Sequence, residues 1–200
     1  RISNAADDAT ISMYTINPST GVLTPTTPAT VSTGYFPQGI AIDPSGRFVY
    51  TANSDDNTVS MFTINQTTGV LTPTTPATVA TGESPGFVTI DPSGRFAYVS
   101  NQNDSTISMY AINSSTGILT PTTPATVSTG DSPFGVAVDP SSKFAYVPNT
   151  YSSNNSVSEF TINSVTGVLT PTTQGIAIAG NQPTAVAVDP SSRFVYVTNR

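Results

Sequence analysis

The sequence contains no cysteine and no histidine, and lysine occurs only once, at Lys143. Without cysteine there is no disulfide framework and no thiol chemistry. Without histidine the chain lacks the commonest general base and the usual zinc ligand, and no familiar catalytic triad can be assembled. Six basic residues against twelve acidic ones give a net charge of −6. Such an acidic composition is not that of a nucleic-acid-binding protein. No apolar run approaches membrane-spanning length.

What the chain does contain is one unit of about 48 residues, repeated. The spacing is 48, 48 and 50 residues for two series, Asp43, Asp91, Asp139 and Asp189, and Gly21, Gly69, Gly117 and Gly167. The extra two residues lie between Asn149 and Val157, which marks that stretch as a loop. We expect one array over residues 1–200, with the second half of a unit at 1–34, full units at 35–82, 83–130 and 131–180, and a first half at 181–200.

Each unit contains four segments typical of β-strands, which in the first full unit are residues 40–42, 48–52, 58–65 and 70–81. The second segment is continuously apolar, as expected for a strand covered on both faces. The fourth contains Pro73 and Pro76, and proline is confined to sheet edges because it cannot donate to a ladder. Four antiparallel strands with the edge strand last predict an all-β fold, a β-propeller with four-stranded antiparallel blades and about four repeats in this chain.

The last unit reads YVTN at Tyr196–Asn199, after the turn Asp189–Phe194. Together with the run Ser12–Thr24, these residues resemble the repeat of YVTN-type and lactonase-family (6-phosphogluconolactonase-like) β-propellers, and the resemblance covers the whole chain. It implies a seven-bladed fold, an exported or surface protein, and permits hydrolysis of sugar lactones. Four units leave three interpretations open: part of a longer propeller, two copies sharing blades in an eight-bladed ring, or one four-bladed ring.

Propeller topology places the loops on one face and the tight turns on the other. The loop face holds the loops between second and third strands and those between units; the turn face holds the other two turns. We expect the turn face to be nearly neutral, because each of the four repeated aspartates has a basic residue nearby (Arg47, Arg95, Lys143 and Arg193). The loop face should be acidic and favour cations or a basic partner. Its acids are Asp7, Asp8, Asp55, Asp56, Glu83, Asp104 and Asp131.

The candidate site residues have competing structural interpretations. The repeated Asp-Pro-Ser turn is interpreted as a capped turn, since catalysis rarely needs four copies. The loop acids could suit calcium but lack the EF-hand spacing, so no metal or cofactor is predicted. Glu159 stands where the other units have methionine. Aromatic residues near the start of the innermost strand could bind a ligand at the channel mouth or pack between blades; they are Tyr35, Phe36, Phe87 and Phe134.

These observations favour an exported, non-enzymatic scaffold at the cell surface or outside the cell. It would present the acidic loop face to a protein, a small molecule or a carbohydrate. One alternative is a lactone hydrolase, with the loop acids as candidates for activating water. A second is a subunit that self-associates through its two half units. Four sequons are possible glycosylation sites, at Asn65, Asn103, Asn113 and Asn154.

Overall fold

Antiparallel β-strands build the whole structure, a computed structural model that describes residues 8–151 and 155–200; no helix occurs in these two ranges. Three sheets have four strands, hydrogen-bonded in chain order. They consist of β3 (Pro37–Ile42), β4 (Phe48–Asn53), β5 (Thr58–Ile64) and β6 (Leu71–Ala80); β7 (Pro85–Ile90), β8 (Phe96–Asn101), β9 (Thr106–Ile112) and β10 (Leu119–Ser128); and β11 (Ala137–Val138), β12 (Phe144–Asn149), β13 (Ser156–Ile162) and β14 (Leu169–Ile178). The four-stranded blade predicted from the repeat is therefore confirmed.

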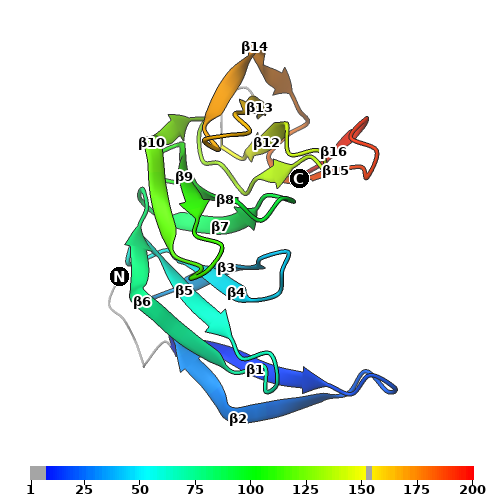
Figure 1. The fold of residues 1–200 in the computed structure, drawn as a ribbon. Coiled ribbons are helices and arrows are strands. Elements are labelled where there is room, and N and C mark those ends of the chain that lie inside the picture. The colour runs from blue at the N-terminus through cyan, green and yellow to red at the C-terminus, as the bar shows by residue number, and fades with distance from the viewer. Residues whose placement is uncertain (1–7, 152–154) are drawn as a thin grey trace.

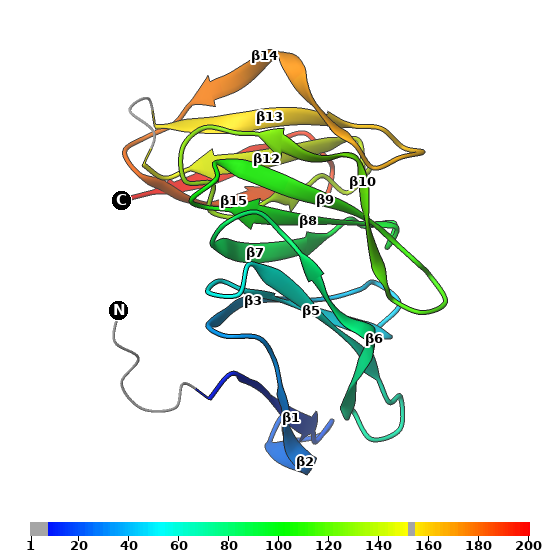
Figure 2. The ribbon, with the colours of Figure 1, turned by 90° about the vertical axis from the view of Figure 1, so that its left-hand side faces the viewer.

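Two half blades flank the full ones. The first pairs β1 (Thr10–Ile16) with β2 (Leu23–Ser32), and the second pairs β15 (Pro183–Val188) with β16 (Val195–Asn199). The sheets fan out along an arc, with β2, β6, β10 and β14 on its convex side and β3, β7 and β15 toward its concave side (Figure 1). The proline-bearing strands are thus outermost, as predicted. The half blades lie at opposite ends of the arc, so the structure does not form a four-bladed ring from one copy (Figures 1 and 2).

The hydrophobic core lies between the blades rather than inside any one of them. One cluster joins Tyr50 and Met61 of the first full blade to Val99 and Leu119 of the second, and a similar cluster joins the second blade to the third. Every residue of β4 and β8 is buried, as the continuous apolar runs predict. Burying each large apolar side chain of these strands stabilises the fold by about 1.5–3 kcal/mol, so neighbouring blades stabilise each other.

The third blade departs from the repeat at its innermost strand. β11 has only two residues, paired as Ala137↔Tyr146 and Val138↔Ala145. Earlier in the chain, Pro133 forms an isolated bridge to Asn149. In β12, Pro148 occupies the position of Ser100 in β8. Because proline has no N–H to donate, the ladder that Ser100 extends to Phe87 cannot form here.

Candidate functional site on the loop face

The hydrogen bonds show which connections share a face. Loops between blades contact loops within blades, for example where the Ser54 amide donates to the Phe36 carbonyl at 3.0 Å. On the opposite side, the Gln66 Nε2 of one turn donates to the Gly46 carbonyl of another at 2.8 Å. The loop face and the turn face are therefore arranged as propeller topology predicts, and Figure 2 shows the turns β5–β6, β9–β10 and β13–β14 on one side.

Two of the predicted loop-face acids act as caps that hold one loop to another. The Asp56 carboxylate accepts the Tyr35 amide at 2.8 Å, and the Asp104 carboxylate accepts the Glu83 amide at 2.7 Å. Both bonds join a loop within a blade to the loop that enters that blade. A carboxylate in this position satisfies a backbone donor and fixes the loop, so both aspartates have a structural role.

The remaining acids of the loop face have no such role. Asp55, Glu83, Asp131 and Asp8 are exposed, and their carboxylates accept no hydrogen bond from the described residues. Asp7 lies outside the described residues. Within residues 8–151 and 155–200, no three acidic side chains converge where a metal ion could be held. Asp55 follows Ser54, which is buried and hydrogen-bonded to Ser84 across the blade boundary at 3.1 Å, so its attachment point is fixed.

The sequence does not identify the asparagine that ends each second strand as a structural centre. Asn53 is fully buried, and its Nδ2 donates to Thr58 and Ser60, both at 2.9 Å. A Cβ on Gly34 would lie only 2.7 Å from that nitrogen, so the loop needs glycine there. The pairing recurs as Gly82 with Asn101. The signal is in the sequence, because a Thr-Gly or Ala-Gly pair precedes every such asparagine by 19 residues.

The four aromatic candidates divide into two pairs. Phe87 and Phe134 are partly buried, and their rings pack at 5.0 Å between centroids with a 56° tilt, which is the inter-blade packing given as the alternative to ligand binding. Tyr35 and Phe36 are 64% and 44% exposed on the loop next to Asp55. The Asp55 amide lies 3.4 Å from the Tyr35 carbonyl. The exposed pair and Asp55 are therefore neighbours on the loop face.

The repeated aspartates of the turn face cap their own turns, as the sequence predicts. The Asp43 carboxylate accepts the amides of Arg47 and Phe48 at 2.8 and 2.7 Å and both donors of Ser45. Burial acts to raise the pKa of Asp43, but these hydrogen bonds to its ionised form leave the pKa below its usual value. Asp43, Asp91 and Asp139 are at most 7% exposed, whereas Arg47, Arg95 and Lys143 are exposed. The surface of this face is thus more basic than a count of charges suggests.

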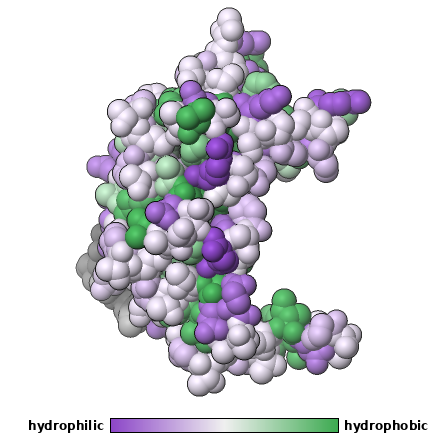
Figure 3. Space-filling model, in the orientation of Figure 1, coloured by the Kyte–Doolittle hydropathy of each residue, from purple (hydrophilic) through white to green (hydrophobic). Residues whose placement is uncertain are grey.

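Two arginines of the turn face link neighbouring blades. Arg47 and Arg95 each stack over the following phenylalanine, with the guanidinium carbon 5.0 Å from the ring centroid. Each donates to a carbonyl of the next blade, at Ser114 and Ser164 respectively. Figure 3, which views the molecule from this side, shows hydrophilic side chains interspersed with apolar ones along the arc.

Glu159 lines a cavity of about 340 Å³ beside β16, together with Tyr146 and Ile178. Its carboxylate accepts the Thr172 hydroxyl at 3.1 Å. In the other blades the equivalent methionine sulfur accepts a backbone amide of the next blade, as Met61 does from Leu119 at 3.3 Å. Glu159 therefore keeps an acceptor at a position that faces the following blade.

Three of the four sequons lie in the described residues, and each asparagine is exposed. Asn65 and Asn113 begin turns in which the side-chain oxygen accepts the amides two and three residues further along the chain, and Nδ2 makes no hydrogen bond to described residues. Asn103 is in a loop of the loop face, and Asn154 lies outside the described residues. Glycosylation stays a prediction. Separately, the described residues contain no helix long and apolar enough to cross a membrane.

A family model described as lactonase, 7-bladed beta-propeller, matches residues 2–81, 74–132 and 120–200. None of the curated proteins matches the chain. Among solved structures, a proposed 6-phosphogluconolactonase from Bacteroides fragilis has a TM-score of 0.80 at 21% identity, covering 96% of this chain and 58% of its own. A protein from Bacteroides uniformis, also a proposed 6-phosphogluconolactonase, has a TM-score of 0.80 at 15% identity, with 98% and 62% covered.

The periplasmic gluconolactonase of Pseudomonas aeruginosa has a TM-score of 0.75 at 19% identity, covering 95% of this chain and 56% of its own. At these identities the likeness to solved structures concerns the fold. The present chain spans less than two thirds of the length of these neighbours.

Proposed function

Because this chain belongs to the lactonase family of seven-bladed β-propellers, we propose that it forms part of an enzyme that hydrolyses sugar lactones. The observation that carries the proposal is the family match, which extends over residues 2–200. Two neighbours are described as proposed 6-phosphogluconolactonases and a third as a gluconolactonase, which supports a lactone of an aldonic acid as substrate. The comparisons favour this alternative over the non-enzymatic scaffold that the composition suggests.

The chemistry requires a base that activates water. A carboxylate takes a proton from water as the water oxygen adds to the lactone carbonyl, and it returns that proton to the ring oxygen as the ring C–O bond breaks, which gives the open hydroxy acid. Within this chain, which contains no histidine, the carboxylates are the candidates for the base. Asp55 is our candidate, because its carboxylate accepts no hydrogen bond from the described residues and the exposed Tyr35 and Phe36 lie beside it as a surface for a sugar ring.

The test is an assay of gluconolactone and 6-phosphogluconolactone hydrolysis. The rate is measured as acid released at constant pH, and the spontaneous rate is subtracted. We expect Asp55→Asn to lower the enzymatic rate by about 10²-fold or more, the usual effect of losing a general base. Asp131→Asn is the matched control, since it removes the same charge from the same face without touching Asp55. Equal effects of the two substitutions would exclude Asp55 as the base, and an absence of turnover in the wild-type protein would refute the hydrolase itself.

We further propose that the protein is exported, which its lack of cysteine permits and its sequons would accommodate. The periplasmic description of the Pseudomonas neighbour supports the same location. Cell fractionation with an antibody to the chain tests this proposal; recovery only in the cytoplasm contradicts it.

A further inference from the structure

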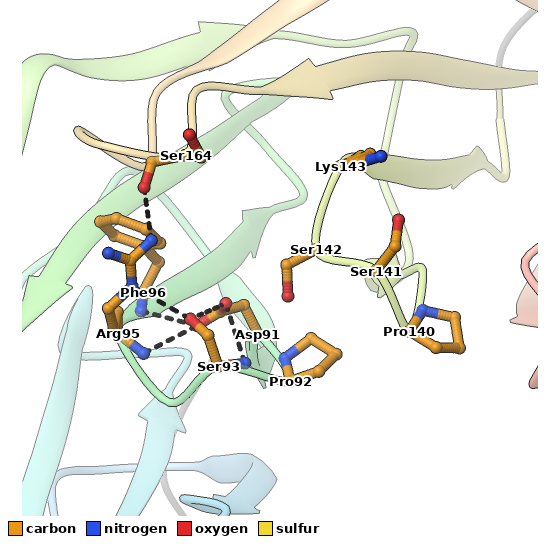
Figure 4. A pocket seen from close by; sticks show the side chains of 10 residues that line it. All are labelled: Asp91, Pro92, Ser93, Arg95, Phe96, Pro140, Ser141, Ser142, Lys143 and Ser164. Atoms are coloured by element: carbon orange, nitrogen blue, oxygen red, sulfur yellow. Dashed lines mark hydrogen bonds between the residues drawn. The ribbon is translucent and has the colours of Figure 1, made fainter.

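A cavity of about 400 Å³ opens on the turn face between the second and third full blades. One wall is the turn from Asp91 to Phe96, the other is the turn from Pro140 to Lys143, and Ser164 closes it at the side (Figure 4). We propose that this cavity binds the phosphate group of a small ligand. The proposal is independent of lactone hydrolysis, because Asp55 and its neighbours are on the opposite face.

Arg95 is held in position before any ligand arrives. Its Nε donates to the Ser93 hydroxyl at 3.3 Å, one terminal nitrogen donates to the Ser164 carbonyl, and the guanidinium stacks on Phe96. A guanidinium has five N–H donors, so three remain after these two bonds. A fixed, planar group with free donors is well suited to bind phosphate, since little side-chain entropy is lost on binding.

The facing turn supplies a second cation and a hydroxyl that makes no hydrogen bond to the described residues. Lys143 is exposed, and its ammonium group makes no hydrogen bond to the described residues. Ser142 adopts a φ of 56°, in a position that Gly46 and Gly94 occupy in the other full blades. This left-handed conformation is unfavourable for serine. Having serine instead of glycine at this position places a hydroxyl at the cavity wall.

The acid beneath the cavity does not oppose an anion at its surface. Asp91 is fully buried, and its carboxylate accepts the amides of Ser93, Arg95 and Phe96 and the Ser93 hydroxyl. Its charge is therefore directed into its own turn, while Arg95 and Lys143 both line the cavity. The equivalent cavity between the first and second full blades is smaller, about 140 Å³, with Gly94 in place of Ser142 and Arg47 as the one cation among its lining residues. The proposed site therefore differs from the one at the first boundary in its second cation and in its hydroxyl.

The experiment is an NMR titration of the ¹⁵N-labelled 200-residue chain with inorganic phosphate, glucose 6-phosphate and, as a neutral comparison, glucose. We expect saturable shifts of the Arg95, Ser142 and Lys143 amides with both phosphates and none with glucose. Lys143→Gln should weaken binding about tenfold, because it removes one of the two charge-assisted contacts. Ser142→Gly restores the glycine of the other full blades, so it should not destabilise the fold. It should weaken phosphate binding less than Lys143→Gln does, because it removes a hydroxyl and no charge.

Arg193→Gln is the matched control, since it removes the same charge from the same face outside the cavity. Tighter binding of glucose 6-phosphate than of phosphate identifies a sugar phosphate as the ligand class, and equal binding identifies inorganic phosphate. Shifts of equal size at all four Asp-Pro turns, or equal weakening by Arg193→Gln and Lys143→Gln, would show general charge screening and overturn the proposal. So would the absence of shifts at Ser142 and Lys143. None of these readouts depends on lactone turnover.

Discussion

Substituting Gly117 by alanine tests whether neighbouring blades are locked together at the turn face. Gly117 has a φ of 73°, and a Cβ there would lie 2.3 Å from Cδ1 of Phe48 in the preceding blade. Beside this contact, the buried Tyr50 hydroxyl donates to the Gly117 carbonyl at 2.8 Å. The chain also contains its own control. Gly69 has a φ of 72° in the equivalent turn, but a Cβ there meets no described atom within 4 Å.

The two substitutions share one destabilising effect and differ in the other. Placing alanine at positive φ costs about 1–2 kcal/mol at either site. At Gly117, the overlap with Phe48 adds about 1–3 kcal/mol, typical of overpacking in a closed core. We therefore expect Gly117→Ala to lower the free energy of unfolding by about 2–5 kcal/mol and Gly69→Ala by about 1–2 kcal/mol in urea unfolding followed by circular dichroism. Equal losses would show that Phe48 moves aside freely and that this contact does not lock the blades.

Three further predictions concern hydrogen bonds, pH and assembly. Tyr98→Phe removes a buried hydrogen bond of 2.9 Å to the Gly167 carbonyl, so it should lower the free energy of unfolding by about 1 kcal/mol. Tyr196→Phe should lower it less, because the exposed Tyr196 hydroxyl makes no hydrogen bond to described residues. Equal urea midpoints for the two variants would contradict this prediction. The pKa values of Asp43 and Asp139 are lowered in the fold, and that of Asp189 falls to about 2 through its bond from Ser191. Their stabilisation is present above the ordinary aspartate pKa and is lost as the pH falls below it, so unfolding should become easier from about pH 4 toward pH 2, and Asp43→Asn should flatten that dependence. If β1 of a second copy pairs with β16 in the register of β5 with β4, Val197 faces Ser12, so mixed Val197→Cys and Ser12→Cys chains should cross-link; a monomeric mass at every concentration contradicts this association.

The strands and their order could be predicted because the same residue pattern recurs in every unit of the chain. The expected strand at residues 58–65 is observed at Thr58–Ile64, and the proline-bearing strand expected at 70–81 is observed at Leu71–Ala80. The short β11 was not predicted. It follows from Pro148, a single residue whose missing N–H matters only once its partner across the ladder is known.

The candidate site could be predicted less well, because residue type does not reveal what a carboxylate already binds. Asp55 and Asp56 are adjacent and chemically identical, yet Asp56 caps the Tyr35 amide and Asp55 accepts no hydrogen bond from the described residues. Likewise, summing charges makes the turn face neutral, but three of its four aspartates (Asp43, Asp91 and Asp139) are buried within their turns and its basic side chains are exposed. In both cases the distinction depends on hydrogen bonds between segments that are remote in the sequence.

Comparison between the units also indicates where a site can have developed. Positions that contact the next blade are nearly fixed, since Phe48 requires glycine at Gly117 and Phe96 requires it at Gly167. A change on one side of such a boundary would need a matching change on the other. The loop-face position of Asp55 has no such partner, and the next two blades have Asn103 and Tyr151 there. A chemically distinct group can therefore arise at one blade without disturbing the repeat, which is why we place the base at Asp55 rather than at the invariant turn aspartates.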